Sequence, residues 1–182
     1  MIVKKYPENK PSSTEFIEIV DSSNHPLGVL SRKAAHQQGL YHRSVLVLIY
    51  DGQDRLLIQK RHPSKRIYPG RWDLPAAGHV PAGESAVDAA CARLKKQVGV
   101  EVGARRIRHL TTINATAETN FEFIYLFSAG KTTAPLIPMP GEVEEITFLD
   151  QSDMEALVLE FPDILTPELV YLWRRQLLFA KF

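Results

Sequence analysis

The sequence predicts an α+β or α/β sandwich fold, in which helices pack on a β-sheet. Strand patterns occur both before and after a central helix at residues 84–99, and a second helix is expected at the end of the chain. A length of 182 residues fits one domain, or one domain with extensions. Residues 1–14 are polar and contain Pro and Ser, so we expect a mobile N-terminal arm there and a single domain over residues 15–182.

Composition and charge narrow the functional classes. The net charge of +1 argues against a nucleic-acid-binding surface, and an apolar fraction of 45% is ordinary for a globular protein. No stretch has the length of a membrane span, and the N-terminus lacks the apolar core of a signal peptide, so we expect a cytoplasmic protein. The single cysteine, Cys91, excludes an internal disulfide, and its place on a helix stripe predicts a buried structural thiol.

The first half of the chain reads as strands with one short helix. Residues 16–20 (FIEIV) alternate as in a half-buried strand, and LGVL can return as its hairpin partner after the turn DSSNHP. Ser31 is a suitable N-cap for a helix that Gly39 would end. Residues 44–50 and 55–61 flank a turn and predict a central hairpin.

The second half predicts strands at residues 107–113 and 121–127, a Pro-rich loop, a strand at ITFL and a short helix beginning near Ser152. Thr166 and Pro167 mark the start of a last helix that should run to the C-terminus. Its apolar residues suit either the core or a homodimer interface; they are Leu169, Leu172, Trp173, Leu177 and Phe179.

The stretch WDLPAAGHVPAGESAVDAACARLKKQVGV, from residue 72 to residue 100, carries the main motif. Its spacing resembles the Nudix superfamily signature, which implies an α/β/α sandwich with a mixed β-sheet between helices. The positions that match are Gly78, Glu84, Leu94, Gly99 and Val100. The positions that depart replace the Arg and the Glu residues of the family; they are Ala92, Arg93, Lys96 and Gln97.

A helical wheel shows what these departures change. One apolar stripe on the helix forms the core face; it consists of Val87, Cys91, Leu94 and Val98. Arg93, Lys96 and Gln97 then lie together on roughly the opposite side, with two positive charges where the family has three carboxylates. Because Mg²⁺ needs anionic oxygen ligands, this side should repel the metal and attract an anion such as a phosphate. The alternative is an ordinary solvated charged face.

The resemblance can be narrowed to one branch. SRKAAHQQGLYHRS, IQKRHPSKRIYPGRWDLPAAGH and PAGESAVDAACARLKKQVGVEV resemble the type I isopentenyl-diphosphate isomerases, and related Nudix hydrolases share the same layout. The resemblance implies a metal site at His36, His42, His79 and Glu122, with Asn120 where the family has another carboxylate. Such a site could hold Mn²⁺ or Zn²⁺, whereas the superfamily generally uses Mg²⁺ or Mn²⁺. Alternatively, the histidines are unrelated to one another.

The same resemblance implies a diphosphate site at Arg61, Lys65 and Arg93. Two guanidinium groups and an ammonium group from separate elements would hold a diphosphate by charge-assisted hydrogen bonds. Since Arg93 is also one of the residues that breaks the hydrolase pattern, we expect a small-molecule diphosphate as the ligand.

Neither family activity fits without exceptions. Ala77 stands where the isomerases carry a cysteine that transfers a proton, and isomerisation of an alkene needs an acid and a base. Glu122 could be one of them. For hydrolysis, several acids could replace the missing glutamates; they are Glu84, Asp88, Glu142, Glu144 and Glu145. Alternatively, Glu84 only favours the helix N-terminus and the others are edge-strand acids.

Three hypotheses follow from these observations. The first is a Nudix-like hydrolase of a small diphosphate compound that needs a divalent metal. The second is an enzyme similar to isopentenyl-diphosphate isomerase, and the third is a diphosphate-binding module without catalysis. We place hydrolysis first because Ala77 lacks the proton-transferring group at the isomerase position.

Overall fold

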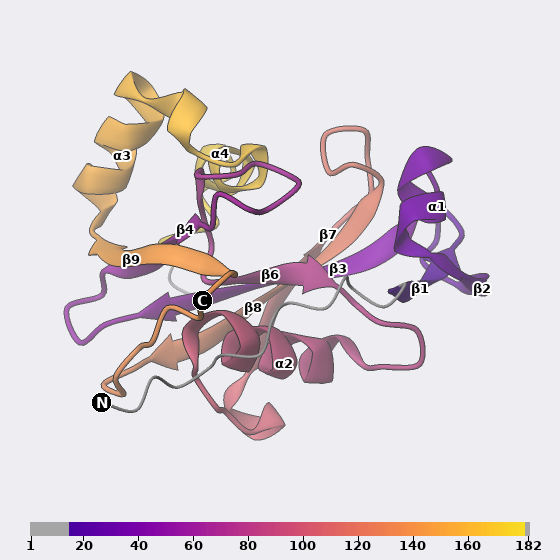
Figure 1. The fold of residues 1–182 in the computed structure, drawn as a ribbon, viewed down its shortest axis with the longest axis horizontal. Helices are drawn as coiled ribbons and strands as arrows, with labels where there is room; N and C mark the ends of the chain where they lie inside the picture. The colour runs from indigo at the N-terminus through magenta and orange to yellow at the C-terminus, as the bar shows by residue number, and fades with distance from the viewer. Residues whose placement is uncertain (1–14, 181–182) are drawn as a thin grey trace, which may run out of the picture.

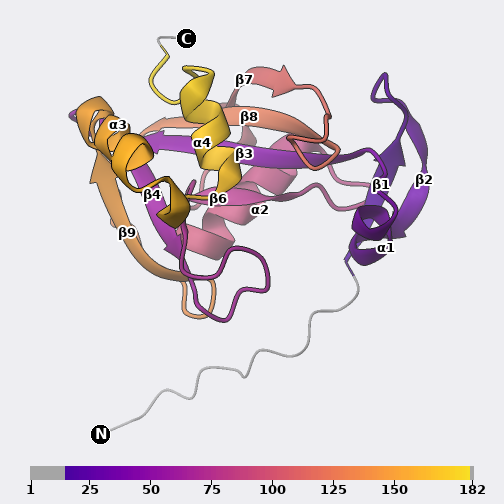
Figure 2. The same ribbon diagram turned by 90° about the horizontal axis from the view of Figure 1, so that it is seen from above.

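A computed structural model describes residues 15–180, so the predicted N-terminal arm lies outside the described residues. Within them, nine strands form one sheet, with α2 on one face and α3 and α4 on the other (Figures 1 and 2). The strands are β1 Phe16–Val20, β2 Pro26–Ser31, β3 His42–Tyr50, β4 Leu56–Arg61, β5 Trp72–Asp73, β6 Ala76–His79, β7 Arg108–Ile113, β8 Glu122–Lys131 and β9 Val143–Leu149. The helices are α1 Arg32–Gln37, α2 Ala86–Val98, α3 Gln151–Glu160 and α4 Pro167–Arg174, with short 3₁₀ turns at Ala104–Arg106 and Pro162–Ile164.

The sheet is mixed, as the resemblance implied. β3 runs antiparallel to β6 and parallel to β8, while β4 runs antiparallel to β9. The predicted central hairpin forms only at its turn, because Tyr50 and Leu56 are the one residue pair in the register between β3 and β4. The two strands then separate, since each takes other partners along the rest of its length. This separation opens the sheet between them.

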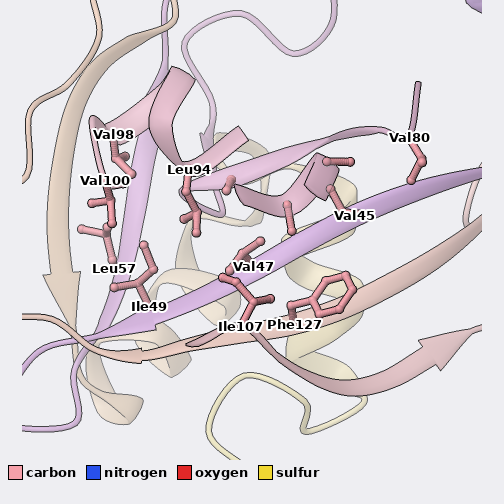
Figure 3. Close-up of a cluster of buried hydrophobic side chains, with 13 residues drawn as sticks. Val45, Val47, Ile49, Leu57, Val80, Leu94, Val98, Val100, Ile107 and Phe127 are labelled. Atoms are coloured by element: carbon pink, nitrogen blue, oxygen red, sulfur yellow. The ribbon is translucent and has the colours of Figure 1, made fainter. Parts of the chain in front are cut away.

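Side chains from the two faces of β3 enter two different hydrophobic clusters. Val45, Val47 and Ile49 pack with α2 residues such as Leu94 on one face (Figure 3). Leu46 and Leu48 pack with residues of α3 and α4 on the other face. β3 therefore reads as a nearly continuous apolar run because it is buried on both sides.

The helix boundaries differ from the prediction in two places. The central helix begins after Ser85, whose side chain accepts a hydrogen bond from the Asp88 backbone, rather than at Glu84. The last helix begins after Thr166 as predicted, but it ends at Arg174 and does not run to the C-terminus. Among residues 15–180, no helix is long and apolar enough to cross a membrane.

Candidate functional site

Three of the predicted metal ligands come from strand ends that meet in the sheet. His42 begins β3 and lies opposite Glu122, the first residue of β8, in the parallel register. His79 ends β6 and pairs with Ser44 of β3. His36 reaches the same place from the last turn of α1. One ligand atom from each of these four side chains lies within 4.8 Å of the others, so the predicted His/Glu set converges.

The orientation of His42 prepares one nitrogen for a ligand. Its Nδ1 lies 2.7 Å from the Leu40 carbonyl oxygen, to which it can only donate, so Nε2 is left with its lone pair. Nε2 is buried and has no hydrogen-bond partner, and its distance of 3.6 Å from Glu122 Oε1 is too long for a hydrogen bond. An unpartnered buried imidazole nitrogen is what a metal ligand requires.

Electrostatics favour a neutral His36 and an ionised Glu122 in this cluster. Burial, together with the nearby His79 and His42 rings, lowers the pKa of His36 to about 4, so His36 is neutral at neutral pH. Burial alone would raise the pKa of Glu122, but the adjoining His42 and His79 imidazoles hold it well below its usual range. Glu122 is therefore an ionised carboxylate beside neutral His36.

A strained loop presents Glu122 to the cluster. Asn120 and Phe121 both have left-handed backbone angles, with φ of 54° and 62°. Two consecutive non-glycine residues in this region are uncommon, and such strain is often found at functional sites. Asn120 also places its amide nitrogen 3.1 Å from His36 Nδ1, so it lies behind a ligand rather than among the four converging atoms.

Arg93, Lys96 and Gln97, the substituted motif positions with polar side chains, do not form one solvated face of α2. Gln97 is buried, which corrects the wheel prediction: its Nε2 donates to the Ala77 carbonyl oxygen at 2.9 Å, and its Oε1 accepts from Gln59 at 2.8 Å. Lys96 is exposed and lies 3.4 Å from Glu142. Arg93 donates to Glu15 at 2.7 Å and to the His79 carbonyl oxygen at 3.1 Å. The anion predicted for this side is thus supplied by the chain itself.

The other two predicted diphosphate ligands are paired in the same way. Arg61 donates to Asp73 at 2.8 Å and to the Ile67 carbonyl oxygen at 3.1 Å. Lys65 lies 2.5 Å from Glu142, the same carboxylate that Lys96 approaches. Each of the three predicted cations therefore has one carboxylate partner from another segment.

The remaining predicted residues lie apart from the cluster. Glu84 is exposed in the turn before α2, and Glu145 is exposed on β9 opposite Lys60; neither belongs to the converging His/Glu group among the described residues. Ala77 is half-buried and packs in the cluster that also holds α4. Cys91 is half-buried, and burial raises the pKa of its thiol, in agreement with a structural role.

Glu168 is a titratable residue that the sequence analysis did not place in the site. It lies in the first turn of α4, where burial and the negative charges of Asp73 and Glu122 raise its pKa to about 7. Thr166, the N-cap of α4, donates to Asp73 at 3.0 Å and so fixes the start of this helix against β5. The sequence showed only an acid at a helix start, so the raised pKa follows from long-range packing.

The sequence matches a known protein family over most of its length. The NUDIX domain profile matches residues 40–169. The chain belongs to the Nudix superfamily, in the branch that resembles the type I isopentenyl-diphosphate isomerases.

Three similar proteins illustrate this placement. Isopentenyl-diphosphate Delta-isomerase of Streptomyces griseus subsp. griseus is 33% identical over 153 residues, which cover 80% of this chain and 76% of that protein. Nudix hydrolase PA4841 of Pseudomonas aeruginosa is 39% identical over 89 residues, 49% of this chain and about half (53%) of that protein. The structure of DR0079 from Deinococcus radiodurans has a TM-score of 0.77 at 22% identity and covers 88% of this chain and 98% of that chain. This last likeness concerns the fold.

A divalent metal fits one of the two places that the family suggests. The His36, His42, His79 and Glu122 cluster fits, because it offers an unpartnered buried nitrogen and an ionised carboxylate. Helix α2, which carries the signature positions, does not fit. Arg93 and Lys96 are cationic, and the Gln97 amide already forms hydrogen bonds with Ala77 and Gln59. Of these two places among residues 15–180, the histidine cluster is therefore the one whose ligand atoms suit a divalent metal.

Proposed function

We propose that this chain is a hydrolase of a small diphosphate compound and that it works with a divalent metal. The observation that carries the proposal is the convergence of three imidazoles and one carboxylate within 4.8 Å. His36, His42, His79 and Glu122 would hold the ion, and Mn²⁺ or Zn²⁺ suits imidazole ligands better than Mg²⁺. Such an ion polarises a phosphoryl oxygen and lowers the pKa of a bound water molecule.

The residues around the cluster supply binding and orientation. Arg61, Lys65 and Arg93 bind phosphate oxygens by charge-assisted hydrogen bonds, in exchange for the carboxylates that they now contact. Glu122 keeps its negative charge beside His42 and His79, with its Oε1 3.6 Å and 3.3 Å from their Nε2 atoms, and so would add an anionic ligand where the rings converge. Phosphoryl transfer depends mainly on such positioning and charge stabilisation.

Phosphorus NMR tests the proposal. The purified chain is mixed with isopentenyl diphosphate and with nucleoside di- and triphosphates, and Mg²⁺, Mn²⁺ or Zn²⁺ is then added. We expect new inorganic phosphate or pyrophosphate only with metal, and at least a hundredfold slower release in Glu122→Gln, consistent with the loss of a charged ligand. Glu118→Gln, an exposed acid in the loop before Glu122, is the matched control and should keep full activity. Ligand binding without any product would support the diphosphate-binding module instead.

One observation favours a second candidate, an isomerase-like proton transfer at carbon. Isomerisation needs two proton-transferring groups, and Ala77 supplies none. Glu168, whose pKa of about 7 is raised in part by the charge of Glu122, could be the second group beside Glu122. This candidate predicts incorporation of solvent deuterium into the carbon skeleton of isopentenyl diphosphate without loss of phosphate. The exchange should disappear in Glu168→Gln.

A further inference from the structure

The carboxylate of Glu142 is held between two lysines that belong to different segments. Its Oε2 lies 2.5 Å from Nζ of Lys65, in the loop after β4, and its Oε1 lies 3.4 Å from Nζ of Lys96, on α2. Each carboxylate oxygen therefore faces one ammonium group. The two lysines that contribute these groups are 31 positions apart in the sequence, so only the fold brings them together.

The backbone around Glu142 fixes this arrangement. Ile137 and Met139 donate to the carbonyl oxygens of Val98 and Gln97 at the end of α2, which ties the loop before β9 to the helix. Glu142 itself donates to the Met139 carbonyl oxygen and accepts from the His62 amide. The carboxylate is thus placed at the junction of α2, β9 and the loop that carries Lys65.

The charges at this junction do not balance. Two ammonium groups face one carboxylate, which leaves one positive charge. Burial alone would raise the pKa of Glu142, but the hydrogen bond and the charge of Lys65, with the charge of Lys96, lower it, so the carboxylate is ionised at neutral pH. A phosphate group carries more negative charge and more oxygens than a carboxylate, and it would satisfy both ammonium groups more completely.

We propose that Lys65 and Lys96 form a phosphate subsite that Glu142 occupies in the absence of ligand, so that Glu142 competes with the phosphate and sets its affinity. The inference rests on the proposed diphosphate-binding function and adds Lys96 and Glu142 to it. Arg93 lies three positions before Lys96 on α2, so the two cations are neighbours along the helix. Arg93 has a carboxylate partner of its own, Glu15, which a phosphate group would displace as it displaces Glu142 from the lysines.

The experiment is a calorimetric titration with methylenediphosphonate, a diphosphate analogue that cannot be hydrolysed, at low ionic strength. In Glu142→Gln the analogue should bind roughly tenfold more tightly, because a charged competitor becomes neutral. Glu144→Gln is the matched control: this residue lies two positions after Glu142 in the chain, its carboxylate is 3.5 Å from Lys60, and its neutralisation should leave the affinity unchanged. Lys96→Gln should bind the analogue more weakly than the parent chain does, because one ammonium group is lost while Lys65 keeps its ion pair with Glu142.

The outcomes separate this inference from the proposed function. Unchanged or weaker binding in Glu142→Gln, with a lower melting temperature, would mean that Glu142 is an ordinary structural ion pair and would overturn the inference even if the chain hydrolyses diphosphates. Should Glu142→Gln fail to fold, Lys96→Gln decides alone, since unchanged affinity there also overturns the subsite. Because the analogue is not cleaved, tighter binding in Glu142→Gln would stand even if no hydrolysis is found.

Discussion

The guanidinium group of Arg93 lies directly against the backbone of Gly78. A Cβ atom at Gly78 would come within 2.5 Å of Arg93 Nε and 2.7 Å of Cζ, so no other residue fits there while Arg93 keeps its place. Arg93 is held in that place by Glu15 and by the carbonyl oxygen of His79. Gly78, which matches the Nudix signature, thus leaves room for Arg93, which departs from that signature.

Gly78→Ala should therefore destabilise the chain by about 1–3 kcal/mol through overpacking against Arg93. In an Arg93→Ala background the same change should cost much less, because the clashing group has gone. Urea unfolding of the four proteins of this double-mutant cycle measures the coupling. Gly28→Ala, where an added Cβ meets nothing within 4 Å, is the control. Equal costs in both backgrounds would contradict the contact.

Gln97→Glu restores a glutamate of the family motif and should nevertheless destabilise the protein by about 2–4 kcal/mol. The new carboxylate would be buried and could not donate to the Ala77 carbonyl oxygen, as the Gln97 amide does at 2.9 Å. Urea unfolding gives the cost, with Ala92→Glu on the exposed side of α2 as the control. A stable Gln97→Glu protein that gains Mg²⁺ binding would show that α2 can still hold a metal.

Glu168 should make the protein less stable as the pH rises. Its folded pKa of about 7 exceeds the ordinary value of 4.5, so the folded state binds the proton more tightly than the unfolded state. Stability should fall between pH 4.5 and 7 and stay low above that range. Glu168→Gln should then gain about 1–2 kcal/mol at pH 8, after allowance for solvent screening, and nothing at pH 4. Thermal melts across this range test it, with the exposed Glu160→Gln as control.

His36 should produce the opposite trend at lower pH. Its pKa falls from 6.5 to about 4 on folding, so the unfolded state takes up a proton first. With EDTA present, the contribution of His36 to stability should be complete above pH 6.5 and be lost as the pH falls toward 4. His36→Gln should flatten this part of the profile. A profile of the same steepness in His36→Gln would assign the acid sensitivity to another group.

Local signals in the sequence predicted much of the fold. Ser31 and Thr166 were predicted as caps from residue type alone, and both side chains accept the expected hydrogen bonds. Gln97 was misplaced because a wheel assigns polar residues to the outside, whereas this amide satisfies the Ala77 backbone inside. The β3–β4 hairpin was only partly right because strand partners far along the chain, β8 and β9, compete with the local pairing.

Less of the candidate site than of the fold can be predicted from local patterns in the sequence. His36, His42, His79 and Glu122 were proposed through a family resemblance, since no local pattern links residues so far apart, and the fold brings them together. The carboxylate partners of the predicted cations were not foreseen, because ion pairs such as Arg93 with Glu15 depend on tertiary contacts between the chain's start and α2. The raised pKa of Glu168 is likewise a consequence of burial and distant charges.

We propose that the metal site of this Nudix chain lies at the histidine cluster and not on α2. A titration with Co²⁺, followed by visible absorption, distinguishes the two places. We expect one equivalent of Co²⁺ per chain and a band typical of imidazole ligation. The band should be lost in both His79→Ala and Glu122→Gln, while Lys96→Gln keeps it. Binding that survives both cluster variants, or that disappears in Lys96→Gln, would contradict the claim.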